Sequence, residues 1–445
     1  MIIFLPSLNS GRSTKAGGKV LNKPRKKFII GLFTAAAMSA SLFVGTGNVS
    51  ASTPKEGARC DKAGDANGAL FCEKKDGALV WTNNTLPKGT YKVGSEMLLS
   101  GPSAFAGVPM SKGVMKAVEE INKSGFLGKG AKIEIIERDS AGKADVAIAA
   151  VNEFVANKVS GIICCALSSI AGAISQVAAA NKIPVVIDAA VLPGLAKPPY
   201  ITRTVIMTGA RNGVQWQSAQ AMVKQIKAKT VAIPETSDNQ GMVADAVMYK
   251  EAVEKAGATN IITIKTQAAD TDLSGAASQI IAQNPDLVIP AMLGGPASRL
   301  IKALRDRGYK GRIVGNYGLS DSTNFAIAGA SLAGVVMPVT FDPSKPTNKI
   351  GRDLVKWWKS GNGGQLPSAY PLMGYTAMYY LATAMKNSGD GNSENVAKAL
   401  QKIGRMETGY GLVRFNKGQI ELAKTAKPMF REWQADGTQK EWNGK

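Results

Sequence analysis

Two adjacent serines, Ser168 and Ser169, have the residue type and position best suited to binding chemistry. They follow an apolar run and precede a helical pattern. Serine at a helix start caps the backbone N–H groups. The same position also offers an anion site, because free N–H groups and the helix dipole favour negative charge. From the residues alone, capping is the simpler interpretation and anion binding the alternative.

The composition excludes most familiar catalytic chemistry. The 445 residues include no histidine, which removes Ser-His-Asp and Cys-His arrangements and His-bearing zinc sites. The glycine-containing loop 100–107 matches neither phosphate-binding glycine motif. Asp245 and Asp321 are better explained as a solvated face and a helix cap than as a catalytic pair. We therefore expect a protein that is not an enzyme and that has no cofactor and no metal site.

The four cysteines fall into two pairs. Cys60 and Cys72 lie in a short polar stretch with little core of its own, so in an oxidising compartment a Cys60–Cys72 disulfide is expected. Cys164 and Cys165 are adjacent at the end of an apolar run. Neighbours on a strand point to opposite faces, so we expect these two to be buried small side chains without a bond between them.

The N-terminal segment is typical of an export signal. A basic cluster at 23–27 precedes an apolar run at 28–44, and small residues follow at 49–51. This layout predicts a cleaved signal peptide over residues 1–51. A membrane anchor is the alternative, but the run contains Gly, Thr and Ser and is short for a span. No cysteine stands where a lipoprotein signal needs one, so we expect a soluble protein exported to the periplasm.

The net charge of +21 raises the question of nucleic acid. Seven basic residues and no acidic one lie within 1–51, so removing this segment lowers the net charge to +14. The remaining basic residues, such as those between 302 and 310, are scattered along helices without an aromatic stacking platform. We expect a solvated basic surface and no nucleic-acid partner.

The rest of the chain alternates strands and helices. Strands are expected at 91–98, 132–138, 160–164, 183–187, 229–233, 260–264, 286–289, 312–315, 334–340, 409–415 and 428–434. Helices are expected at 111–123, 143–157, 170–181, 211–227, 240–256, 273–283, 295–306, 346–360, 370–387 and 393–402. Such alternation favours parallel sheets covered by helices on both faces. Nine strands before residue 341, in two series, favour an α/β fold of two Rossmann-like lobes.

The order and spacing of several segments resemble the type I periplasmic solute-binding proteins, in particular the Leu/Ile/Val-binding family of ABC transporter substrate-binding proteins. The segments that carry the resemblance are 99–107 (LSGPSAFAG), 117–122 (AVEEIN), 125–128 (GFLG), 133–139 (IEIIERD), 168–169 (SS), 183–190 (IPVVIDAA) and 303–308 (ALRDRG). The resemblance runs from about residue 93 to the C-terminus. Residues 52–90, with the first cysteine pair, are extra to the family pattern.

The resemblance implies two α/β lobes joined by a three-crossover hinge. The crossovers would fall near 204–210, 335–341 and 409–415. The first lobe would comprise 91–205 and 341–410, and the second 210–335 and 411–445, with residues 52–90 as an N-terminal extension. Closure of the lobes would bury a ligand in the cleft and create the form that docks on a membrane permease.

The resemblance also assigns binding roles. The family's carboxylate-binding serine matches Ser168, assisted by backbone groups of Ser169, Ala189 and Val191. The aromatic position of the first loop falls at Ala106, beside Phe105. Two second-lobe aromatic positions fall at Gln240 and Leu293, and an aromatic of the late first-lobe segment is kept as Tyr370. The family's acidic partner of the substrate ammonium falls at Tyr317.

The tyrosine at position 317, where the family has an acidic residue, predicts the class of ligand. A buried ammonium without a partner is costly, so a simple α-amino acid is disfavoured. We expect a small organic ligand, either uncharged or a carboxylate, with aromatic acids favoured by Phe105, Tyr317 and Tyr370. The expected function is a monomeric receptor that delivers this ligand to the membrane permease of an ABC importer. The alternative is a ligand sensor of the same fold that signals to a membrane kinase.

Overall fold

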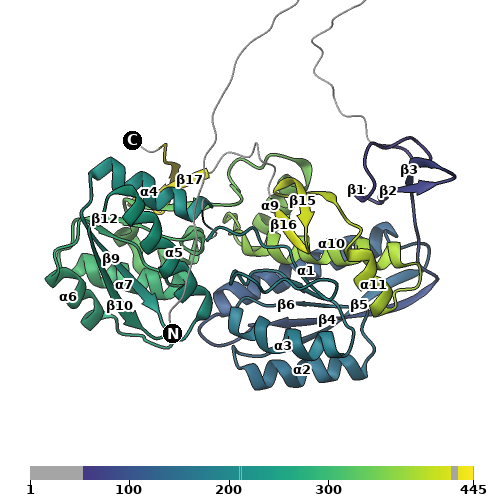
Figure 1. Cartoon of the computed structure of the whole chain (residues 1–445), viewed down its shortest axis with the longest axis horizontal. Helices are drawn as coiled ribbons and strands as arrows, with labels where there is room; N and C mark the ends of the chain where they lie inside the picture. Colours follow the sequence, from purple (N-terminus) through teal and green to yellow (C-terminus); the bar gives the residue numbers. More distant parts are fainter. Residues whose placement is uncertain (1–53, 210, 212, 422–428, 444–445) are drawn as a thin grey trace, which may run out of the picture. The chain divides into compact units, whose positions relative to one another are not determined.

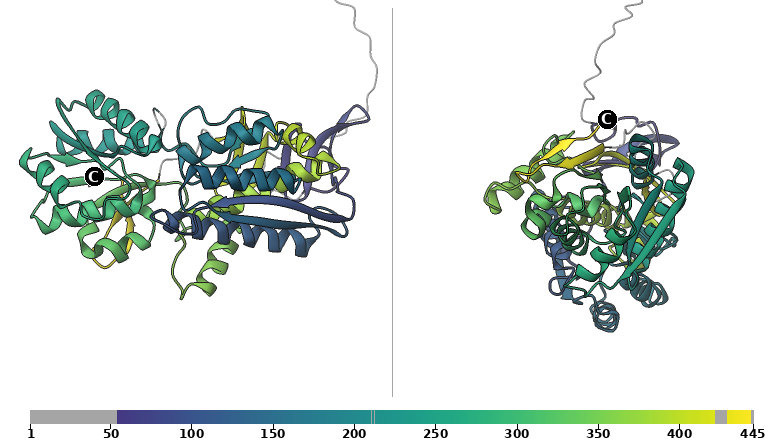
Figure 2. Two further views of the ribbon diagram at one scale, coloured as in Figure 1. Left: turned by 90° about the horizontal axis from the view of Figure 1, so that it is seen from below. Right: turned by 90° about the vertical axis from the view of Figure 1, so that its left-hand side faces the viewer.

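The computed structural model describes residues 54–209, 211, 213–421 and 429–443. The predicted signal peptide lies outside these residues. The described chain forms two sheets, each with helices packed on it (Figures 1 and 2). Within these ranges, no helix has the length and apolarity needed to cross a bilayer.

The first sheet is a parallel sheet with an antiparallel addition. Its strand order is β3-β2-β1-β14-β15-β16-β8-β7-β6-β4-β5, and the run from β16 to β5 is parallel. The strands are β1 (Asp65–Asn67), β2 (Leu70–Lys75), β3 (Ala78–Thr82), β4 (Gly89–Met97), β5 (Ala131–Asp139), β6 (Ile162–Cys164), β7 (Val185–Ile187), β8 (Ile201–Arg203), β14 (Arg405–Thr408), β15 (Gly411–Asn416) and β16 (Gln419–Glu421).

Helices from both ends of the chain cover this sheet. They are α1 (Ala104–Ser124), α2 (Ala144–Ala156), α3 (Ser168–Ala180), α9 (Lys349–Gly361), α10 (Tyr370–Ser388) and α11 (Ser393–Leu400). Alternate strand residues face different cores: Ile163 and Val186 pack with α1 and α10, whereas Ile162 and Val185 pack with α2 and α3. Residues of β4 (blue) and α10 (yellow-green) thus pack in one apolar core, although they are far apart in sequence (Figure 1).

The second sheet is built in the same way. Its order is β10-β9-β11-β12-β13-β17-β18, parallel as far as β13. Its strands are β9 (Thr230–Thr236), β10 (Asn260–Thr266), β11 (Leu287–Val288), β12 (Arg312–Val314), β13 (Val335–Val339), β17 (Met429–Trp433) and β18 (Gln439–Glu441). Its helices are α4 (Val214–Ile226), α5 (Gln240–Ala256), α6 (Ser274–Ala282), α7 (Gly294–Asp306) and α8 (Thr323–Ala328), with the 3-10 turns η1 (Tyr317–Ser320) and η2 (Gly329–Leu332).

The described chain passes between the sheets at places that differ in part from the expected ones. It enters the second sheet after β8 and leaves that sheet after β13. However, β15 and β16 pair in the first sheet, so the strands at 411–416 and 419–421 do not belong with the second series. The chain rejoins the second sheet only at β17. The expected third crossover at 409–415 is therefore wrong, because the β14–β15 hairpin stays within one sheet.

One helix begins earlier than its sequence suggests. The sequence predicts a loop at 100–107, but α1 starts at Ala104. Pro109 lies inside the helix, where it has no N–H to donate to the carbonyl four residues earlier. Phe105 and Ala106 are therefore helical residues rather than loop residues.

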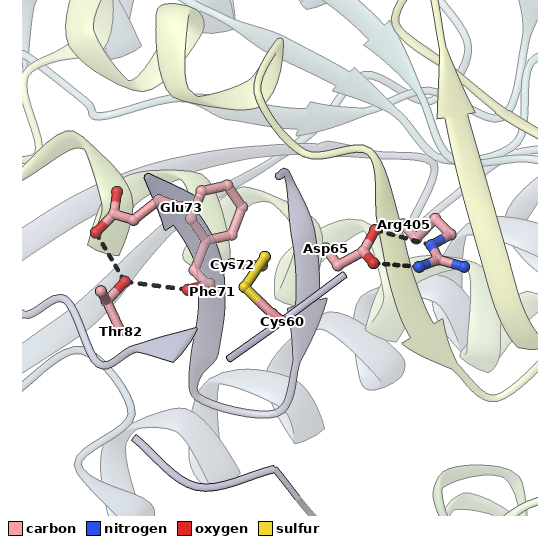
Figure 3. The surroundings of a disulfide bond; sticks show 7 residues. All are labelled: Cys60, Asp65, Phe71, Cys72, Glu73, Thr82 and Arg405. Atoms are coloured by element: carbon pink, nitrogen blue, oxygen red, sulfur yellow. Dashed lines mark hydrogen bonds and ion pairs between the residues drawn. A yellow bond between two sulfur atoms is a disulfide. The ribbon is translucent and has the colours of Figure 1, made fainter. Parts of the chain in front are cut away.

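The N-terminal extension adds strands β1 to β3 to the first sheet. β1 pairs in parallel with β14, and the Cys60–Cys72 disulfide joins the segment before β1 to β2, as expected (Figure 3). Asp65 on β1 and Arg405 on β14 form an ion pair across this junction. The side chain of Lys386 donates hydrogen bonds at 2.6 Å to the carbonyl of Ala69 and to Asn83 Oδ1. The extension is thus fixed to the body by pairing, charge and a buried lysine.

Candidate functional site

The start of α3 is the centre of the candidate site. Ser168 is the first residue of this helix, and the N-cap position is Leu167, which makes no side-chain cap. The capping interpretation of the two serines is therefore wrong. The buried Ser168 Oγ instead accepts a hydrogen bond of 3.2 Å from the backbone N–H of Leu192. Ser169 is exposed beside it.

The loop after β7 is held against this helix start. It carries Ala189 and Val191, which are both buried. Arg203 Nη1 donates to the carbonyls of Ala190 at 3.3 Å and Leu192 at 2.9 Å. Ser168 and Arg203 thus both bond to Leu192, and Arg203 also holds Ala190, so residues 190–192 of the loop are fixed.

Arg203 is a residue that the sequence reasoning missed. Its side chain is 1% exposed, and burial lowers its pKa to about 10. Its Nη2 donates to Gln419 Oε1 at 2.5 Å, and no acidic residue of the described chain forms an ion pair with it. The signal was an arginine inside the apolar segment 200–206. A buried guanidinium without a carboxylate partner favours negative charge nearby.

An aromatic pair from α1 and α10 borders the same region. The rings of Phe105 and Tyr370 meet edge-to-face with centroids 6.0 Å apart. Two close backbone contacts between the helices set this geometry: a Cβ on Gly113 would lie 2.0 Å from the carbonyl oxygen of Pro371, and one on Gly374 would lie 2.2 Å from that of Met110. Only glycine permits such an approach. Ala106 is buried one residue after Phe105.

The second sheet contributes Tyr317 and Leu293. Tyr317 starts η1 after β12, and Leu293 is the N-cap residue of α7. Both pack, partly buried, against the apolar cluster that contains Ala106, Ala189 and Tyr370. The structure therefore gathers residues of the two sheets into one cluster.

Gln240 does not join this cluster. It is exposed at the first residue of α5, whereas Met242, two residues later, is buried in the cluster. Gly241 lies between them, and a Cβ on it would be 2.9 Å from Ser168 Oγ. The start of α5 thus meets the start of α3 at a glycine. Sequence matching missed Met242 because it compared single positions rather than helix faces.

Tyr410 is a further aromatic that the sequence reasoning did not identify. It packs against the same cluster, and its buried hydroxyl has no hydrogen-bond partner. Burial raises its pKa, and the charges of Tyr317 and Asp188 add to the effect. A hydroxyl that lacks a partner can bind a polar ligand atom. The sequence analysis placed this residue in an expected strand at 409–415 and gave no sign of a binding residue.

Two buried carboxyl groups lie beneath the loops of the first sheet. Burial, together with the nearby Glu96, raises the pKa of Asp188 to about 8. Burial raises the pKa of Glu96 to about 7, and a hydrogen bond from Ser140 opposes this. Asp188 Oδ1 accepts the N–H of Cys165 at 2.9 Å, while its Oδ2 has no partner. Both groups are therefore neutral over much of the pH range and repel an anion weakly.

The second cysteine pair corrects the sequence prediction. Cys164 and Cys165 form a disulfide between adjacent residues, with Cα atoms 3.3 Å apart. The expectation of opposite-facing, unbonded side chains applies to regular strands, but β6 ends at Cys164. These sulfurs and Glu96 form a group with possible metal-ligand geometry in the described chain. Disulfide sulfurs are poor ligands compared with thiolates, so the residues present do not favour a metal.

Comparison with known proteins places the chain in a family. A sequence profile described as "Periplasmic binding protein" matches residues 90–430. The Leu/Ile/Val-binding protein homolog 3 of Brucella melitensis is 27% identical over 323 residues, covering 72% of this chain and 85% of that protein. The Leu/Ile/Val-binding protein of Escherichia coli is 26% identical over 367 residues, covering 81% and 95%.

Solved structures share the fold. A leucine-binding protein from Thermotoga maritima matches with a TM-score of 0.71 at 19% identity, covering 79% of this chain and 97% of that one. A solute-binding protein from Rhodopseudomonas palustris in complex with 4-hydroxybenzoate matches with a TM-score of 0.69 at 22% identity, covering 80% and 96%. The two sheets are those of the type I periplasmic binding fold. The chain belongs to the periplasmic binding protein family, in the group of the Leu/Ile/Val-binding proteins.

Proposed function

We propose that this protein is a periplasmic receptor that closes on a small organic carboxylate, with aromatic acids as the preferred class, and delivers it to the membrane permease of an ABC importer. It acts as a monomer and does not transform the ligand. The observation that carries the proposal is the start of α3, where a buried serine and a buried arginine flank one loop.

The charge distribution supports an anionic ligand. Backbone N–H groups at the start of α3 favour a carboxylate. Arg203 lies behind the loop that Ser168 contacts and brings an uncompensated positive charge. The raised pKa of Asp188 removes much of the repulsion that an ionised side chain would cause there.

The aromatic side chains support a ring in the ligand. Phe105, Tyr317, Tyr370 and Tyr410 all belong to the cluster or pack against it. They provide apolar area with hydroxyls at the edge, which suits a hydroxylated benzoate. Two relatives of the same fold were solved with hydroxybenzoates, 4-hydroxybenzoate and 3,4-dihydroxybenzoic acid.

An α-amino acid fits less well, although the curated relatives carry Leu/Ile/Val-binding names. Tyr317 stands where the family has an acid. Burial raises the pKa of Tyr317, and the charges of Asp245 and Asp188 add to the effect, so these two carboxyl groups are the candidates for pairing with an ammonium. Asp245 accepts a hydrogen bond from Gln215 Nε2 at 3.0 Å, and its burial raises its pKa to about 7. Neither carboxyl is an obvious partner for a cation.

Titration calorimetry with 4-hydroxybenzoate, benzoate and leucine tests the proposal. We expect the benzoates to bind and leucine to bind at least about tenfold more weakly. Ser168→Ala should weaken benzoate binding by about tenfold or more, because it removes a hydroxyl at the helix start. Ser175→Ala is the matched control, since Ser175 is a buried serine of the same helix without a partner. Tight binding of leucine alone, unaffected by Ser168→Ala, would overturn the proposal.

A further inference from the structure

A cavity lies on the first sheet, apart from the candidate site. Its volume is about 200 Å³, and its walls include Gly68 of the β1–β2 turn, Tyr375, Thr376 and Tyr379 of α10, and Met406 and Glu407 of β14. None of the residues assigned to the proposed carboxylate site lines it. The cavity is therefore separate from the proposed carboxylate site.

Two tyrosine rings form an ordered aromatic wall. The rings of Tyr375 and Tyr379 are 4.8 Å apart between centroids and tilted by 41°. Their hydroxyls both donate to Glu120 Oε2, at 2.6 Å and 3.3 Å. Because both hydroxyls are engaged, the rings are held in place before any ligand arrives. Ordered aromatic rings attract cations through the negative charge of their faces.

The polar groups of the cavity are incompletely paired. Thr376 is 2% exposed, and its Oγ1 has no hydrogen-bond partner among the residues that the structure describes. Glu407 is the charged residue of the lining, and its Oε1 accepts a hydrogen bond of 2.5 Å from Asn348 Nδ2. No lysine or arginine of residues 54–443 that the structure describes forms an ion pair with Glu407. The cavity thus combines a negative charge with an unpaired hydroxyl.

The N-terminal extension closes one side of this cavity. The family profile begins only at residue 90, so Gly68 comes from a segment outside the matched region. The disulfide at Cys72 fixes β2 (Figure 3). The hydrogen bond from Lys386 to the carbonyl of Ala69 fixes the β1–β2 turn itself. This arrangement gives the extension a role in shaping a cavity as well as in lengthening the sheet.

We propose that this cavity is a binding site for a small organic ammonium ion. Glu407 neutralises the charge, and the rings of Tyr375 and Tyr379 contact the alkyl groups around the nitrogen. Thr376 accepts a hydrogen bond from a ligand that carries a donor, such as the hydroxyl of choline. A neutral ligand of the same size would leave the carboxylate uncompensated. An anion would meet that carboxylate with no positive group in the lining.

Calorimetry with choline and tetramethylammonium tests the site, and 3,3-dimethylbutan-1-ol serves as the uncharged analogue of choline. We expect both cations to bind in millimolar or tighter range and the alcohol to bind at least about tenfold more weakly. Glu407→Gln should reduce choline affinity at least about tenfold. The control is Glu421→Gln, an exposed acid on β16 of the same sheet that does not line the cavity.

Binding of 4-hydroxybenzoate reports separately on the proposed carboxylate site. Glu407→Gln should leave that affinity unchanged, which also shows that the variant is folded. Ser168→Ala should leave choline affinity unchanged. Absence of cation binding, equal binding of the alcohol, or choline binding that survives Glu407→Gln would each overturn the ammonium site without affecting the proposed receptor function.

Discussion

At the scale of single residues, the unusual feature is a set of buried ionisable groups that form no ion pair within the described residues. Arg203 is almost fully buried and bonded only to carbonyl and amide oxygens. Asp188 and Glu96 are completely buried, and each has one carboxyl oxygen without a partner. Such groups cost stability, and groups of this kind often mark functional sites. Here they lie beneath the loops to which we assign carboxylate binding.

Asp188→Asn should change how stability depends on pH. The pKa of Asp188 is raised from 3.8 to about 8 in the folded protein. Its contribution to stability is therefore fully present below pH 3.8 and is lost as the pH rises through about 8. At about 1.4 kcal/mol per pKa unit, the loss is several kcal/mol at most. The variant lacks this loss, so it should become more stable relative to the wild type as the pH rises.

The measurement is urea unfolding of both proteins across this pH range. The informative quantity is the slope of the free energy of unfolding against pH. The buried amide that Asp188→Asn introduces adds a constant cost of about 1–3 kcal/mol at every pH and does not change that slope. Asp76→Asn is the control: Asp76 is exposed in a left-handed turn that asparagine also adopts. Parallel pH curves for Asp188→Asn and the wild type would show that Asp188 is ionised in the folded state.

At the scale of elements, the contact between α1 and α10 positions the aromatic side chains. Gly374→Ala would place a Cβ 2.2 Å from the carbonyl oxygen of Met110, which is backbone and cannot rotate away. The helices must separate, at a cost of about 1–3 kcal/mol in the free energy of unfolding. Since Tyr370 is the first residue of α10, 4-hydroxybenzoate affinity should fall as well.

Chemical denaturation and calorimetry on Gly374→Ala measure these two effects. Gly361→Ala is the matched control, because Gly361 is also helical and a Cβ there meets nothing within 4 Å. Its stability should be unchanged or slightly higher, since alanine favours helix. Wild-type stability of Gly374→Ala would mean that the helices can separate without cost.

Long periodic elements were predictable from sequence, and short or polar ones were not. The expected helix 240–256 coincides with α5, and the expected strand 132–138 lies within β5. By contrast, β8 and β16 have three residues each, too few to show a period. The strands of the extension carry mixed polar residues and are stabilised by the disulfide and by pairing with β14, which are long-range effects. The early start of α1 depends on Gly107, which packs against the carbonyl of Leu98.

The candidate site was likewise only partly predictable from the sequence. The resemblance predicted a binding role for Ser168, and the departure at Tyr317 predicted an unusual ligand; both stay predictions. Arg203, Met242 and Tyr410 could not be found in this way, because their importance comes from tertiary contacts with loops that are distant in sequence. The alternation of side chains along a strand did not predict the bond between Cys164 and Cys165, because β6 ends at Cys164 and Cys165 lies outside it.

At the scale of the whole molecule, the two sheets meet where α3 and α5 begin. The substitution Gly241→Leu tests whether ligand binding needs this contact. A Cβ on Gly241 would lie 2.9 Å from Ser168 Oγ, so leucine cannot fit while the two helix starts touch. Unliganded stability should be unchanged, because α5 keeps its cap from Asn239. Affinity for 4-hydroxybenzoate should fall by about a hundredfold, and small-angle scattering should show no ligand-induced compaction. Gly275→Leu, at the second residue of α6 with open space around it, is the control and should bind and compact like the wild type. Normal compaction of Gly241→Leu with ligand would show that the protein binds without bringing α3 and α5 together.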